Sequence, residues 1–152
     1  MRELAHNERA VGTIEFALIV PVLILLTVGF LDIARALNAQ IVLSSASQEG
    51  AHYAILNPTA APSAIAGAAR ARVEPLDGGA ITVTAEYYNT ATAMFVPWPS
   101  AGIPASSPNP TGVMVRVNVS YPWSAVSALA DSFFSGTGSR TLTSASLMET
   151  RR

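Results

Sequence analysis

An apolar run near the amino terminus constrains the fold of this chain more than any other feature. Residues 16–31 carry no charged side chain, and as an α-helix they would extend about 24 Å. The hydrocarbon core of a bilayer is about 30 Å thick. A helix that begins at Val11 is long enough to cross it, but this helix takes the carboxylate of Glu15 into or near the lipid. The sequence therefore predicts one membrane-spanning helix with an acidic residue close to its start.

The position of Glu15 has three explanations. A charged side chain costs a few kcal/mol at the centre of a membrane and less toward the edge. Glu15 therefore lies at the interface, is protonated there, or pairs with a cation. Because acidic residues inside membrane segments more often serve a function, we expect a cationic partner.

Composition restricts the chemistry of the chain. Half of its 152 residues are hydrophobic and 12% are charged, which is too apolar for an ordinary soluble domain and fits one domain with a membrane anchor. A net charge of −1 offers no basic surplus for nucleic acid, and the absence of Cys excludes disulfides and Cys-ligated zinc. His6 and His52 lie far apart, and neither has a metal-ligand partner at i+4. We expect no enzyme activity, metal, cofactor or small-molecule substrate.

The residues before the apolar run differ from a secretory signal peptide. Residues 1–9 form a short polar segment that ends in Arg9, and the small residues Ala10 and Gly12 stand directly before the run. A secretory signal peptide has its cleavage site after the apolar core instead. In this arrangement the sequence resembles a type IV prepilin, and more closely the TadE-like pseudopilins of the tight adherence (Tad/Flp) pilus system.

This resemblance implies that a prepilin peptidase removes a leader of residues 1–10. A cut between Ala10 and Val11 leaves Glu15 as the fifth residue, and Phe16 after it also fits the TadE-like pattern. Leaders of this kind usually end in Gly, whereas this one ends in Ala; a cut after Gly12 would leave Glu15 third. The cut creates an ammonium group on Val11, which would pair with Glu15 of a neighbouring subunit and set its register.

A second stretch carries the same resemblance more specifically. It comprises Asp32, Arg35 and the sequence EGAHYA, in which Glu49, Gly50, Ala51 and Tyr53 form the family element. From spacing alone, Asp32 and Arg35 can pair on one helical face where the helix leaves the membrane. An ordinary solvated pair is an equal alternative to an assembly role.

The rest of the chain predicts a small domain outside the membrane. We expect a long helix over residues 11–57, whose first half spans the membrane, and an outer α+β domain over residues 58–152. Gly50 is expected to provide close packing, because the helical pattern continues past it. The fold class is therefore α+β, with a long amino-terminal helix packed on a small antiparallel sheet, as the resemblance to pilins also implies.

Within the outer domain, a short helix is predicted from Pro62 to Val73. Alternating apolar residues predict strands over residues 81–88 and 112–121, and a weaker third strand over residues 140–148. Dense Pro, Gly and Ser residues over 97–111 predict an exposed loop between the first two strands.

Three aromatic residues are candidates for an interface. Trp98 lies between two prolines and is either an interface anchor or folded back onto the sheet. Phe133 and Phe134 share a face of a predicted helix within residues 122–134, which either packs in the core or contacts a subunit or the membrane.

These features indicate a minor pilin or pseudopilin that helps to assemble a Tad/Flp-type adhesive pilus. The implied partners are the membrane, a prepilin peptidase and other pilins, and the implied location is the bacterial inner membrane with the outer domain in the periplasm or, after assembly, in an extracellular pilus. The alternative is a permanently anchored envelope protein whose outer domain binds a partner or ligand. Cleavage distinguishes them, because the alternative does not require removal of residues 1–10.

Overall fold

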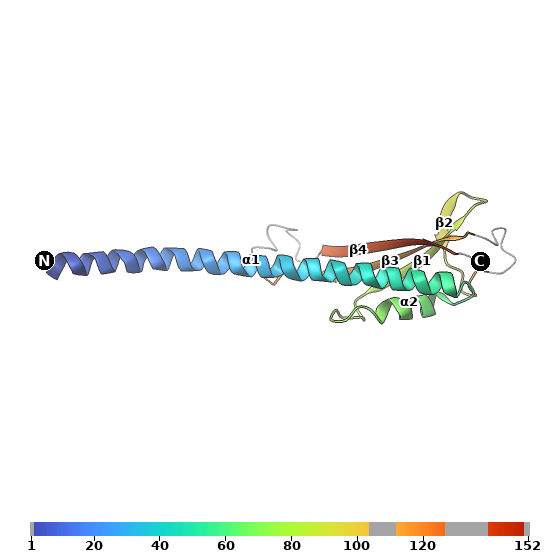
Figure 1. Cartoon of the computed structure of the whole chain (residues 1–152), viewed down its shortest axis with the longest axis horizontal. Helices are drawn as coiled ribbons and strands as arrows, with labels where there is room; N and C mark the ends of the chain where they lie inside the picture. The colour runs from blue at the N-terminus through green and yellow to red at the C-terminus, as the bar shows by residue number, and fades with distance from the viewer. Residues whose placement is uncertain (1, 104–111, 127–139, 151–152) are drawn as a thin grey trace. The chain divides into compact units, whose positions relative to one another are not determined.

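The computed structural model describes residues 2–103, 112–126 and 140–150, with side chains from residue 11 onward. The described elements are, in chain order, α1 (Arg2–Leu56), α2 (Pro62–Arg70), β1 (Thr82–Asn89), β2 (Met94–Pro97), β3 (Met114–Trp123) and β4 (Arg140–Glu149) (Figure 1). The chain divides into two compact units, one of residues 1–35 with 125–138 and one of residues 36–124 with 139–152. The helix α1 runs from the first unit into the second.

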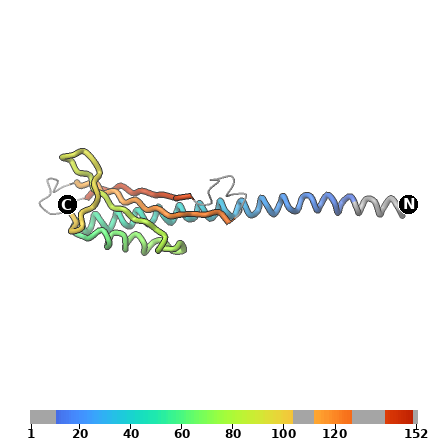
Figure 2. The backbone as a smooth tube through the Cα atoms, turned by 180° about the vertical axis from the view of Figure 1, so that it is seen from behind, coloured from blue at the N-terminus to red at the C-terminus, as the bar shows by residue number. Residues whose placement is uncertain are grey.

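The second unit is built around a four-stranded antiparallel sheet in the order β2-β1-β3-β4. The tube in Figure 2 shows β3 and β4 extended along the later part of α1, with α2 beside that part of the helix. The predicted α+β class, with a long amino-terminal helix on a small antiparallel sheet, is confirmed.

Alternation in β3 explains which face of the sheet is buried. Val115, Val117 and Val119 are fully buried, whereas the residues between them are only half-buried. Successive side chains of a strand point to opposite faces, so the valines form the core side of the sheet. The part of α1 within this unit contributes small residues to the same core, together with Leu43: Ala39, Ala46, Ser47, Gly50, Ala51 and Ala54.

The short second helix ends earlier than the pattern predicted. Pro62 stands at its start, where a residue without an N–H is tolerated, and α2 ends at Arg70 rather than at Val73. The core nevertheless includes Ile65, Ala69 and Val73. A hydrogen-bonded turn follows the helix and extends to Val73, whose N–H donates to the Arg70 carbonyl.

The segment expected to be an exposed loop differs from that expectation in its first part. Trp98, Gly102 and Ile103 are buried, and the Ile103 N–H donates to the Pro58 carbonyl at 2.7 Å. Gly102 has φ +76°, and a Cβ there would lie 2.3 Å from the Thr59 carbonyl carbon, so only Gly fits. This part of the chain therefore packs against the turn that follows α1. Residues 104–111 lie outside the described residues.

Candidate assembly site in the long helix

The first part of α1 exposes its large apolar side chains. Leu18 is 70% exposed and Phe16 69%, and most of the other large apolar side chains over residues 11–31 are also exposed. Among the described residues, α1 is the one helix long and apolar enough to cross a membrane. An apolar surface of this extent marks a contact with lipid or with other proteins. The chain therefore carries an amino-terminal helix suited to anchoring in a membrane.

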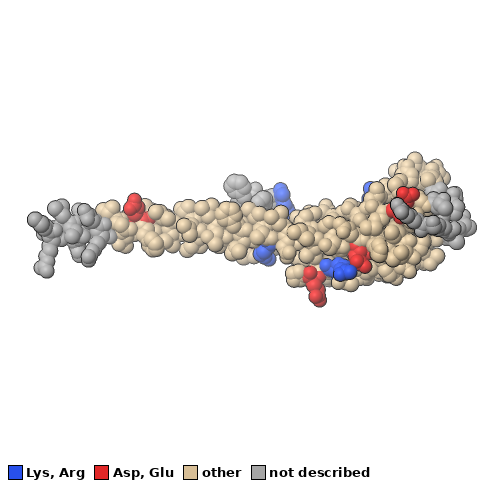
Figure 3. All heavy atoms as spheres, viewed as in Figure 1, with Lys and Arg blue, Asp and Glu red and all other residues tan. Residues whose placement is uncertain are grey.

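Glu15 interrupts this apolar surface. It is the sole charged residue between positions 11 and 31, and Figure 3 shows this part of the helix as tan except for one acidic group. The side chain is exposed, and it forms no hydrogen bond or ion pair with any residue that the structure describes. Any partner for its carboxylate therefore comes from outside the described part of the chain.

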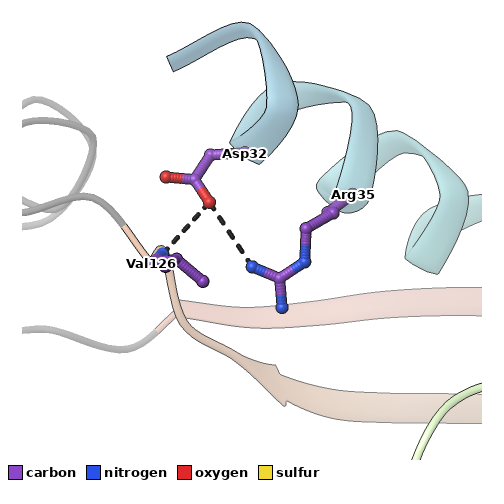
Figure 4. A network of polar contacts seen from close by, with 3 residues as sticks. All are labelled: Asp32, Arg35 and Val126. Carbon is purple, nitrogen blue, oxygen red and sulfur yellow. Dashed lines mark hydrogen bonds and ion pairs between the residues drawn. The ribbon is translucent and has the colours of Figure 1, made fainter. Parts of the chain in front are cut away.

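Asp32 differs from Glu15 because the chain itself surrounds it. Its side chain is only 2% exposed, and its Oδ1 accepts a hydrogen bond from the Val126 backbone N–H at 3.1 Å. The Arg35 Nη1 lies 3.4 Å from the same oxygen (Figure 4). The expected pairing of Asp32 with Arg35 is present, but the carboxylate is not a solvated group. It holds the segment that follows β3 against α1.

The two members of this pair contribute unequally. The Arg35 side chain is 56% exposed, so water screens its attraction to Asp32. The Val126 N–H instead donates to a carboxylate that is itself buried, and a hydrogen bond to a charged group contributes about 1.5–3 kcal/mol. The backbone contact is therefore the larger of these two contributions. Sequence spacing predicted the contact of Asp32 with Arg35 but not its contact with Val126, because Asp32 and Val126 are 94 positions apart.

The family element lies where α1 meets α2 and β3. A Cβ added to Gly50 would lie 3.0 Å from Val117 Cγ1 and 3.2 Å from Ala69 Cβ, so the predicted close packing is present. Ala51 is fully buried and Tyr53 packs against the core from its edge. Beside them, the Glu49 carboxylate lies 3.4 Å from the Arg72 guanidinium. These four positions thus join the helix to the rest of its unit.

The aromatic candidates have different outcomes. Trp98 is 5% exposed, and its indole Nε1–H donates to the Ala60 carbonyl at 2.9 Å. Its ring is therefore part of the core of this chain rather than an anchor open to a partner, which is the second of the two explanations weighed above. Phe133 and Phe134 lie outside the described residues.

Sequence reasoning missed a polar cluster on the face of the sheet opposite the valines. Arg116 Nε and Nη2 both lie 2.7 Å from Glu86 Oε2, and its guanidinium carbon lies 4.1 Å from the Phe95 ring centre. Asn118 Nδ2 donates to the same Glu86 oxygen at 3.2 Å. Charge and alternation place these residues on polar faces, but the register of β1 with β3 is needed to bring them together. No group of three acidic or His residues in the described part of the chain could hold a metal ion.

The arrangement defines an α+β protein with an amino-terminal membrane-anchoring helix. Residues 10–52 match the model of the TadE-like protein family, which confirms the resemblance found in the sequence. The match begins at Ala10 and ends within α1, so it covers neither α2 nor the sheet. No curated protein and no solved structure matches the chain.

Proposed function

We propose that this chain is a minor pilin of a Tad-type pilus, which a prepilin peptidase processes between Ala10 and Val11. The single observation that carries the proposal is the TadE-like match over residues 10–52. Its first residue coincides with the end of the proposed leader. The match also includes the whole apolar segment, so the similarity lies in the part of the chain that would enter the membrane.

The surroundings of Glu15 support an intermolecular role for this residue. Its carboxylate is exposed on an apolar helix and has no partner among the described residues. In the proposed mechanism, cleavage creates an ammonium on Val11, and Glu15 meets the ammonium of a neighbouring subunit as the helices associate. Two charges that are costly to bury singly are tolerated when they are buried together. The proposal assigns structural roles beside this contact to Phe16, Asp32 and Arg35. None of these residues takes part in a chemical reaction.

The location follows from the same proposal. The helix anchors the protein in the bacterial inner membrane, with its amino terminus in the cytoplasm and the sheet-containing unit in the periplasm. Its other partners are then the prepilin peptidase and the remaining pilins of the machinery. No chemical step is assigned to the protein, which acts through assembly.

Intact-mass measurement of the membrane-extracted protein tests the proposal. With the peptidase present, the mature chain should begin at Val11, and without it the chain should remain whole. Ala10→Lys should block cleavage while preserving membrane insertion, whereas Ala5→Lys, within the leader but away from the cut, should be processed. Assembled material that begins at Met1 would contradict the proposal and favour a permanently anchored envelope protein. A mature chain that begins at Thr13 would move the cut to Gly12.

A further inference from the structure

The bond proposed for cleavage lies inside a helix. The helix α1 begins at Arg2 and continues without a break through Ala10 and Val11 to Leu56 (Figure 1). In an α-helix each carbonyl accepts a hydrogen bond from the N–H four residues later, so the Ala10 carbonyl is the acceptor for the Ile14 N–H. The bond between Ala10 and Val11 is therefore helical before a peptidase acts on it.

Hydrolysis requires this carbonyl to leave its helical hydrogen bond. The peptidase adds water across the amide between Ala10 and Val11, which leaves a carboxylate on Ala10 and an ammonium group on Val11. In the intermediate the Ala10 oxygen carries negative charge, and the donors that stabilise such an oxygen have to approach it to about 2.7–3.1 Å. Inside the helix, the neighbouring backbone shields this carbonyl from such donors and from the attacking water. The turn that contains the bond therefore has to open first.

Few contacts among the described residues hold this turn closed. Val11 is 58% exposed and Ile14 62%, and a Cβ added to Gly12 would meet nothing within 4 Å. Opening of the turn therefore breaks backbone hydrogen bonds without a loss of core packing. The helical segment ahead of Gly12 comprises residues 2–11, and isolated helices shorter than about 12–15 residues are only marginally stable. Opening at Gly12 thus releases a segment with little helical stability of its own.

Packing does not explain the glycine at position 12. At Gly50 a Cβ would lie 3.0 Å from Val117 Cγ1, and at Gly102 a positive φ favours glycine. Gly12 has no neighbour of this kind among the described residues, and its φ lies outside the left-handed region. Its remaining distinctive property is conformational, because glycine is less favourable in a helix interior than every residue except proline.

We infer that Gly12 is a positioning residue for processing, which lowers the free energy needed to open the turn and so sets the rate of cleavage. This inference rests on the proposed function, since it concerns the same peptidase. Gly12 has no side chain to react or to bind, and it acts through the conformation of the Ala10 carbonyl. It stands at the start of the apolar run, where water can still bond the backbone groups that opening releases.

Processing rates of full-length variants in membranes test the inference. With the prepilin peptidase in excess, intact mass followed over time gives the rate at which residues 1–10 are lost. Gly12→Ala should be cleaved about fivefold more slowly, because Ala favours the closed helix. Gly29→Ala is the matched control and should be cleaved at the unmodified rate. Gly29 lies in the same apolar run, and a Cβ there also meets nothing within 4 Å.

Two further variants separate helix opening from residue size. Asn is larger than Ala but forms helices less readily, so Gly12→Asn should be cleaved faster than Gly12→Ala and only about twofold below the unmodified rate. A peptidase that merely requires a small residue at this position would give the opposite order. Addition of Ile14→Gly to Gly12→Ala returns a glycine to the same turn and should restore most of the rate.

Amide hydrogen exchange in the absence of the peptidase measures the opening itself. The Ile14 N–H is the informative group, because its acceptor is the Ala10 carbonyl. In the uncleaved chain in detergent, this amide should exchange about fivefold more slowly in Gly12→Ala than in the unmodified chain. Gly29→Ala should leave its exchange unchanged. Slower cleavage of Gly12→Ala without slower exchange would overturn the inference, because the peptidase would then recognise Gly12 directly.

Three other results would also overturn it. Gly12→Ala could be cleaved at the unmodified rate, and a loss of pili in that variant would then identify Gly12 as a contact between helices. Gly12→Asn could be cleaved more slowly than Gly12→Ala. The mature chain could begin at Thr13, which would make Gly12 the residue before the cut. Failure of the unmodified chain to be cleaved at all would instead refute the proposed function, and this inference with it.

Discussion

Residues 11–31 and residues 36–56 belong to the same helix, yet their side chains are covered in opposite ways. In the first stretch large apolar side chains such as Phe16 and Leu18 are exposed. In the second the buried positions are mostly Ala, Ser and Gly, and the sheet and α2 pack against them. A helix that packs closely within its own chain needs small residues at the contact, whereas a helix that contacts lipid or other helices through long side chains does not. Residues 36–56 therefore pack within their own chain, whereas residues 11–31 present a surface that other molecules must cover.

The carboxylates of Glu15 and Asp32 differ in the same way. Asp32 is buried and accepts a hydrogen bond from the Val126 N–H, whereas Glu15 is exposed without a partner among the described residues. Removal of Asp32 should therefore affect the fold, and removal of Glu15 should affect assembly. Substitutions along α1 can break or sharpen this division, and the largest effect is expected at Glu15.

Glu15→Ala should still be inserted and cleaved, because loss of a charge makes the segment easier to place in lipid. It should fail to assemble, since the partner ammonium would be buried without a counter-ion at a cost of about 3–5 kcal/mol. This cost lowers the equilibrium constant for assembly roughly a hundredfold or more. Copurification with pilus subunits and pilus counts by microscopy measure this effect. Thr27→Ala is the control, because the Thr27 hydroxyl donates to the Leu23 carbonyl of its own helix. Wild-type levels of both readouts in Glu15→Ala would leave Glu15 as an interfacial charge.

Gly50→Leu should destabilise the packed part of the helix. The new side chain would begin 3.0 Å from Val117 Cγ1, and overpacking of this kind costs about 1–3 kcal/mol. Chemical denaturation in detergent measures the loss. The matched control is Gly67→Leu in α2, where an added Cβ meets nothing within 4 Å and helix propensity predicts a gain of up to about 1 kcal/mol. Equal stabilities of the two variants would show that Gly50 is not a packing position.

Asp32→Ala should release the segment at Val126 with a loss of about 1.5–3 kcal/mol, because the segment loses its hydrogen bond to a charged, buried carboxylate. Faster amide exchange at Val126 would report the release. Asp32→Asn retains an acceptor oxygen and should lose less. If the Ala and Asn variants exchange at the rate of the unmodified chain, the segment is held by other contacts.

Arg35→Ala should have the smallest effect, below about 1 kcal/mol, because the guanidinium is more than half exposed. The exchange rate at Val126 should stay close to that of the unmodified chain, since Asp32 keeps its backbone donor. An effect as large as that of Asp32→Ala would mean that Arg35 orients the carboxylate.

The sequence predicted the elements that carry strong periodic patterns. The apolar run, the valines of β3 and the position of Gly50 each follow from local spacing and were confirmed. The strand β2 was missed because it has only four residues and adjoins a Pro-rich segment, so that its pairing with β1 defines it. The roles of Ala10, Val11 and Glu15 in processing and assembly stay predictions.

Two features could not be predicted because they depend on contacts between distant positions. Spacing revealed that Asp32 and Arg35 can pair, but the burial of Asp32 requires the segment around Val126 to lie against the helix. The burial of Trp98 likewise depends on the Ala60 carbonyl, 38 positions earlier. The Pro, Gly and Ser content of residues 97–111 had instead predicted an exposed loop around Trp98.

The burial of Trp98 also gives the molecule a built-in optical reporter. The chain has two tryptophans, and Trp98 and Trp123 are both buried in the unit that contains the sheet. The first 35 residues contain none. Intrinsic tryptophan fluorescence therefore follows the unfolding of the sheet-containing unit without a direct signal from the anchor, so emission spectra recorded in detergent micelles and in lipid vesicles can be compared on the same basis.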